Sequence, residues 1–110
     1  MKVRLIRKES IERYVLHNAR SRSSFQIWLT LLRQADWDEP ADIPKTFGSA
    51  DLQGYVFKRV VFNIAGNKYR MICKYHVGIT RVHLAIKWIG THANYTELCK
   101  KNGQYTINSF

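Results

Sequence analysis

The sequence predicts an α+β fold in which two amphipathic helices precede a small antiparallel sheet and a short helix follows it. Two observations carry this prediction. Apolar residues recur at helical spacing in the first third of the chain, and from Tyr55 onward they alternate with a period of two. The chain has 110 residues, of which 45% are hydrophobic and 13% aromatic, enough for one core. We therefore expect residues 1–110 to form one domain.

The N-terminal part of the chain reads as a strand followed by two helices. Lys2 to Arg7 alternates loosely and fits a first strand. Ser10 suits the N-cap of a helix, and a second helix is expected to begin near Ser23 or Ser24. That second helix carries an apolar stripe, which we interpret as core-facing: Phe25, Ile27, Trp28, Leu31, Leu32 and Ala35. The segment 36–54, with both prolines and an acidic cluster, is expected to be a long connection with one short helical turn.

Three strands are expected at residues 57–65, 68–77 and 81–89, joined by turns at Gly66-Asn67 and near Gly78. Alternation gives the strands two faces. The face expected to pack on the helices carries Val60, Phe62, Ile64, Tyr69, Met71, Cys73, Tyr75, Val82, Leu84, Ile86 and Trp88. The opposite face carries Arg59, Val61, Asn63, Arg70, Ile72, Lys74, His76, His83, Ala85, Lys87 and Ile89. Beyond them, Thr91 to Lys101 predicts a short helix, and Gln104 to Ile107 a last short strand.

The charge of the chain favours a polyanionic partner. The net charge is +10, and residues 55–110 hold nine Lys or Arg against one acidic residue. Phosphate contacts by such cations supply most of the non-specific affinity for nucleic acid. We favour a nucleic-acid partner over the alternative that the basic surface only keeps the protein soluble. A membrane partner is not expected, because no apolar run approaches a bilayer span and no basic amphipathic helix is evident. Without a recognisable secretory signal the protein is expected to be cytoplasmic, with Cys73 and Cys99 as free thiols.

The residues on the polar face fit RNA cleavage without a metal or other cofactor. Glu97 is the sole carboxylate among residues 55–110, which argues against a two-metal nuclease. Arg and Lys can stabilise the charge of a phosphoryl transition state, and His can transfer protons near neutral pH. Non-catalytic interpretations stay open: Arg70 and Lys74 could be solvated surface residues, and His92 could be a helix-cap residue. His76 and His83 are expected mainly to flank a hairpin.

Several segments of the sequence resemble those of a known family. The runs Val60–Arg70 (VVFNIAGNKYR) and Gly90–Tyr95 (GTHANY), preceded by a Gly-Ser-Ala-Asp loop at 48–51, look like those of the HigB toxins of bacterial type II toxin–antitoxin systems. The resemblance implies a RelE-like fold with two N-terminal helices packed on one face of a small antiparallel sheet. It implies an mRNA interferase acting on mRNA at the ribosome. It also implies a HigA-type helix-turn-helix antitoxin, through which alone the pair contacts operator DNA.

We assign the site from the polar face and the resemblance together. The predicted catalytic residues are Arg70, Lys74, His92 and Tyr95, and the predicted RNA-binding residues are Arg59, Asn63, Lys87 and Thr91. Thr96 stands where the family often has Asp, and which group acts as acid or as base stays open. The alternative function is a non-catalytic RNA- or ribosome-binding module. A weaker alternative is a module that docks an acidic protein.

Overall fold

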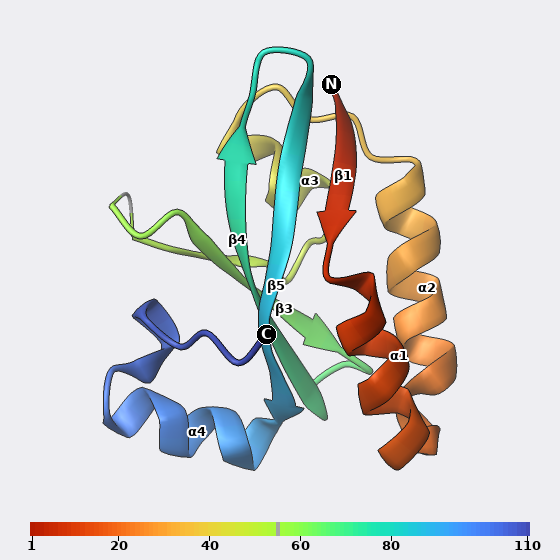
Figure 1. Ribbon diagram of the computed structural model, residues 1–110, viewed down its shortest axis with the longest axis vertical. Helices are drawn as coiled ribbons and strands as arrows, with labels where there is room; N and C mark the ends of the chain where they lie inside the picture. Colours follow the sequence, from red (N-terminus) through yellow and green to blue (C-terminus); the bar gives the residue numbers. More distant parts are fainter. Residues whose placement is uncertain (55) are drawn as a thin grey trace.

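The computed structural model describes residues 1–54 and 56–110 and confirms an α+β fold. Tyr55, where alternation was expected to begin, lies outside the described residues. Five strands form one sheet in the order β1-β5-β4-β3-β2 (Figure 1). They are β1 (Lys2–Ile6), β2 (Asp51–Gln53), β3 (Arg59–Ile64), β4 (Tyr69–Val77) and β5 (Arg81–Thr91). The expected sheet was antiparallel, but β1 pairs with β5 in parallel, so the sheet is mixed.

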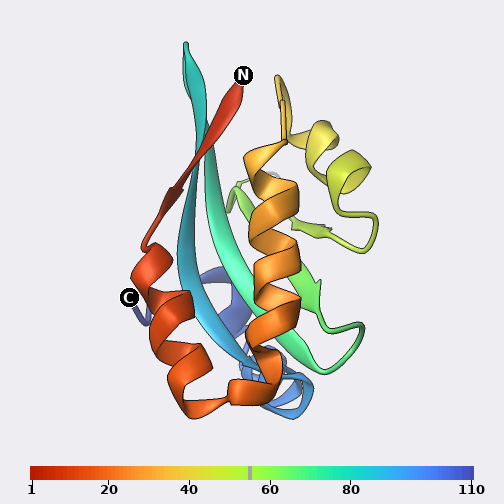
Figure 2. The same ribbon diagram turned by 90° about the vertical axis from the view of Figure 1, so that its right-hand side faces the viewer.

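The helices lie on both sides of this sheet. Helices α1 (Lys8–His17) and α2 (Arg22–Arg33) cover one face, and α4 (His92–Lys100) lies on the other side (Figures 1 and 2). The predicted N-cap of the first helix was wrong by three residues, since Arg7 takes the N-cap position and Ser10 is buried inside the first turn. A 3-10 helix (Pro40–Asp42) and α3 (Ile43–Thr46) supply the expected helical turn of the long connection. None of the helices in the described part of the chain has the length and apolar character needed to cross a bilayer.

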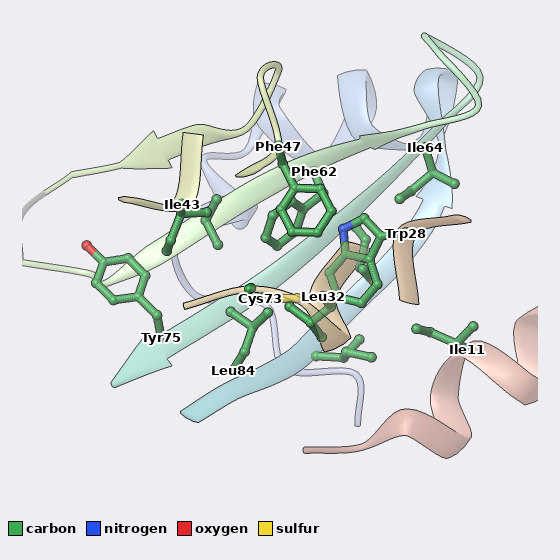
Figure 3. Close-up of a cluster of buried hydrophobic side chains, with 14 of the residues drawn as sticks. Ile11, Trp28, Leu32, Ile43, Phe47, Phe62, Ile64, Cys73, Tyr75 and Leu84 are labelled. Carbon is green, nitrogen blue, oxygen red and sulfur yellow. The ribbon is translucent and has the colours of Figure 1, made fainter. Parts of the chain in front are cut away.

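The core lies between the sheet and the pair α1 and α2, and aromatic rings fill its centre. Trp28 of α2 stacks on Phe47 with 5.4 Å between ring centroids, and Phe47 meets Phe62 of β3 edge to face at 5.1 Å (Figure 3). Such offset and edge-on contacts are the preferred arrangements of aromatic pairs. Trp28 therefore belongs to the core, as the helical stripe predicts, although Ile27 and Leu31 of that stripe are exposed.

The two-face prediction is confirmed for β3, β4 and the first half of β5, but it is wrong at the end of β5. Cys73 pairs with Ile86, whereas its neighbour Ile72 pairs with Trp88, so Lys87 is an extra residue in β5. Because one inserted residue reverses the alternation, the side chains beyond it exchange faces. Ile89 joins the core cluster, and Trp88 lies on the opposite, polar face.

The segment after α4 packs on this polar face instead of extending the sheet. The strand expected at Gln104 to Ile107 is not formed, because Gly103–Tyr105 is a 3-10 helix. The Arg59 guanidinium donates hydrogen bonds to the carbonyls of Gln104 (3.3 Å) and Ile107 (2.7 Å), and the Ser109 amide donates to the carbonyl of Lys87 (2.9 Å). These bonds pin the C-terminal segment across the middle of the sheet.

Candidate functional site

The N-terminus of α4 presents His92 at the edge of the polar face. Thr91 caps the helix, since its hydroxyl accepts a bond from the Asn94 amide (3.1 Å) while the Asn94 side chain accepts one from the Thr91 amide (3.2 Å). The His92 amide donates to the carbonyl of Lys68 in the β3–β4 turn (2.9 Å). The His92 side chain is exposed. The predicted RNA-binding residue Thr91 thus has a capping role that fixes the position of His92.

Arg70 lies beside this helix start, held by its own hairpin. Its guanidinium donates to the side-chain oxygen of Asn67 and to the carbonyl of Tyr69 (3.2 Å). The guanidinium carbon is 6.0 Å from the centre of the Tyr95 ring, within reach of a cation–π contact. Arg70 is only 8% exposed, so the cation is oriented and partly shielded before any ligand arrives. Two of its five N–H groups are used in these two bonds.

Tyr95 completes a cluster with Arg70 and His92. Partial burial, a hydrogen bond with Cys99 and the nearby charges of Cys99 and Asp51 raise the pKa of Tyr95, and the Arg70 cation opposes that rise only in part. The phenol is therefore protonated at neutral pH and can donate a proton or a hydrogen bond, but it cannot serve as a base. Tyr95 also meets the Trp88 ring at 6.2 Å.

Thr96 takes the position where a carboxylate is common in the resembling family. Its hydroxyl donates to the carbonyl of His92 (3.1 Å) within α4. This bond stays within α4 and places no negative charge near the imidazole. Glu97, the carboxylate that α4 does carry, bonds to Lys100 (2.9 Å).

The predicted site residues divide into three groups. Arg70 lies against Tyr95, His92 begins the same helix three residues before Tyr95, and Asn63 pairs with Arg70 in the sheet. Lys74 does not join them: it lies four residues along β4 from Arg70, which corresponds to roughly 13 Å of strand. Lys74 and Lys87 instead line a separate cavity.

Arg59 forms the third group by itself. It is 6% exposed, burial lowers its pKa, and its described hydrogen bonds go to the C-terminal segment. A guanidinium placed this way ties two parts of the chain together. It does not present a free surface to an RNA backbone.

Two residues near the cluster were missed from the sequence. Trp88 was assigned to the core, because the extra residue at Lys87 leaves no mark in the apolar pattern. Asp51 was assigned to a loop, but it lies in β2, opposite Val61, and its charge reaches Tyr95. A strand of three residues is too short to show alternation, although Asp51 ends the Gly-Ser-Ala-Asp loop that the resemblance included. The sheet thus brings one carboxylate near the cluster.

The mixed five-stranded sheet with helices on both its faces is consistent with the fold of RelE-like toxic components of toxin–antitoxin systems. The chain belongs to the HigB_toxin family, since the model of that family, described as the RelE-like toxic component of a toxin-antitoxin system, matches residues 21–98. A search of the curated proteins found no match. Membership of this family implies an antitoxin partner.

Proposed function

We propose that this protein is an mRNA interferase, an endoribonuclease that cleaves mRNA at the ribosome without a metal. The observation that carries the proposal is the Arg70 guanidinium, oriented by Asn67 and Tyr69 and set against Tyr95, on the helix that the exposed His92 begins. A preorganised cation beside a proton-transfer group is what phosphodiester cleavage by an internal nucleophile requires. The net charge of +10 supports an RNA substrate.

The reaction is an attack of the ribose 2′-oxygen on the adjacent phosphorus. His92 in its neutral form takes the 2′-OH proton, and Arg70 stabilises the negative charge that grows on the phosphoryl oxygens. The bond to the 5′-oxygen then breaks. Tyr95, which is held protonated, is placed to give that oxygen a proton. The products are a 2′,3′-cyclic phosphate and a 5′-hydroxyl, so all atoms and charges balance.

The proposed partners follow from the family. The antitoxin partner is proposed to be of the HigA type, with a helix-turn-helix domain that carries the pair to operator DNA. The mRNA is proposed to be presented by the ribosome, which would hold the strand extended over the exposed edge where α4 begins. The protein is expected to work in the cytoplasm.

The test compares wild type with His92→Ala in bacteria under inducible expression, followed by primer extension on mRNA. We expect growth arrest and new 5′ ends with wild type, and a cleavage rate lowered by roughly 10²- to 10⁴-fold with His92→Ala. His17→Ala is the matched control, because His17 is another exposed histidine on a helix far along the chain. It should behave as wild type.

Two results would contradict this function. Intact transcripts and normal growth with soluble wild-type protein would remove the toxin activity. Growth arrest that persists in His92→Ala, without new 5′ ends, would instead favour the non-catalytic RNA- or ribosome-binding module.

A further inference from the structure

A second basic site lies on the same face of the sheet, apart from the Arg70 cluster. It is a cavity of about 530 Å³, a size typical of ligand pockets. Its lining includes Lys74 and His76 of β4, His83 and Lys87 of β5, and Lys58 just before β3. The C-terminal segment, bonded to Arg59 and Lys87, runs between this cavity and the cluster.

The register of the sheet explains why these side chains converge. His76 pairs directly with His83, and the two rings lie 6.1 Å apart. Lys74 pairs with Ala85, whose small side chain leaves room between the longer ones. Lys58 is held from the other side, since its carbonyl accepts a bond from the Tyr75 amide (2.8 Å).

The charges around the cavity are not balanced by protein groups in the described chain. None of the residues that line it is acidic, and none of its three lysines takes part in a described ion pair. An acidic residue, Glu39, lines a neighbouring cavity that shares Lys58 and Tyr75 with this one. Three like charges around one hollow repel each other, and an anion with several oxygens would relieve that repulsion.

The lining also contains apolar surface beside the cations. Ile6 is 36% exposed and Val56 is 85% exposed at this cavity. An inorganic anion would make no favourable contact with this apolar surface, whereas a nucleotide carries a ribose and a base next to its phosphate. The mixed lining therefore fits a nucleotide better than a simple salt.

We propose that this cavity binds the phosphate of a nucleotide, as a second anchor for the RNA strand outside the bond that is cleaved. The inference rests on the proposed function for its choice of RNA, because a free nucleotide offers the same chemistry. Lys58, Lys74 and Lys87 hold the phosphate oxygens, and the apolar rim contacts the adjoining nucleoside. This assigns Lys74 to strand binding and not to the catalytic cluster.

The test measures binding of a fluorescent 2′-O-methyl RNA oligonucleotide, which lacks the attacking hydroxyl and cannot be cleaved. Affinity is determined at several salt concentrations for wild type and for the triple variant Lys58→Gln/Lys74→Gln/Lys87→Gln. Removing one lysine–phosphate interaction lowers the slope of log affinity against log salt by about 0.7 for a single strand, so the slope should fall by about 2. The thermal melting temperature of each variant confirms that it folds.

The matched control removes the same number of charges from the helical side of the molecule. It carries Lys8→Gln, Arg13→Gln and Arg20→Gln, all exposed residues on or after α1. Its salt slope should equal that of wild type. If the slope falls equally in both triple variants, or if it falls in neither, the cavity is not a phosphate site and the inference fails.

A competition arm identifies the source of the phosphate. Displacement of the oligonucleotide from wild type only by unlabelled RNA assigns the cavity to the strand, and displacement by ADP at similar concentration assigns it to a free nucleotide. Both results uphold a nucleotide-phosphate site. The two proposals fail separately: wild type that binds through the cavity but cuts no RNA would refute the nuclease function, whereas a nuclease with unchanged slopes would refute the second anchor.

Discussion

Replacing Arg59 with Gln tests whether this cation holds the protein together or holds RNA. The change removes the two hydrogen bonds to Gln104 and Ile107. Bonds to a charged donor contribute about 1.5 to 3 kcal/mol each, and the longer of these two lies at the weak end. The bond to Ile107 is only part-buried, so that carbonyl can recover a water partner, and we expect destabilisation somewhat below the simple sum, about 2.5 kcal/mol. For a chain of this size that corresponds to a melting temperature lower by roughly 10 °C.

Three measurements separate the two roles of Arg59. Thermal unfolding gives the stability. Hydrogen exchange at the Ser109 amide, which bonds to the Lys87 carbonyl, shows whether the C-terminal segment has come loose. The salt slope of RNA binding counts phosphate contacts. Arg81→Gln, an exposed cation on β5, is the control and should leave stability and Ser109 exchange unchanged. Unchanged stability and exchange in Arg59→Gln, with a salt slope lower by about 0.7, would refute the structural role and restore the RNA contact.

Two further predictions concern the packing and the ionisation of the cluster. A Cβ on Gly90 would lie 2.4 Å from the Trp88 ring, so Gly90→Ala should displace that ring, destabilise the protein by about 1 to 3 kcal/mol and lower cleavage. Gly48 has open space around it, so the control Gly48→Ala should be neutral. The melting temperature and acrylamide quenching of tryptophan fluorescence check both variants. Because the pKa of Tyr95 is raised in the folded protein, the unfolded chain loses the phenolic proton at lower pH than the folded protein does. The free energy of unfolding should therefore fall as the pH rises through about 10. Denaturant titrations at about pH 8 to 10.5 should show a smaller decrease for Tyr95→Phe than for wild type. An identical alkaline loss in both proteins would show that Tyr95 is not perturbed.

Much of the fold can be predicted from local patterns of apolar residues, because each strand and helix must bury one apolar face. Alternation places Phe62 and Met71 correctly, since a shift by one residue would expose every apolar side chain of the strand. The same reasoning misplaces Trp88, because an inserted residue at Lys87 changes the face without changing the composition. Arg59 shows a different limit. Its partners lie 45 and 48 residues further along the chain, and no local pattern encodes such a contact.

The prediction of the site was limited in a related way. The residues of one motif, His92 and Tyr95, can be found together because a helical turn keeps them close. Arg70 and Lys74 are also close in sequence, yet a strand carries them apart by its length, and each meets partners from other elements. Spacing therefore identifies which residues share a face, and only the folded sheet decides which of them act on the same phosphate.

The absence of a carboxylate at Thr96 narrows how protons can move in this cluster. Arg70 stays cationic and Tyr95 stays protonated, so neither can accept a proton at neutral pH. In the proposed reaction His92 is therefore the base among these three residues, and its side chain is exposed, while Glu97, the carboxylate that α4 carries, bonds to Lys100. The phenol of Tyr95 carries the proton that the leaving 5′-oxygen needs, although its raised pKa makes it a weaker acid than a free tyrosine. Asp51, brought near Tyr95 by β2, has a charge that disfavours loss of the phenolic proton, so it keeps Tyr95 from acting as a base but also makes it a weaker acid.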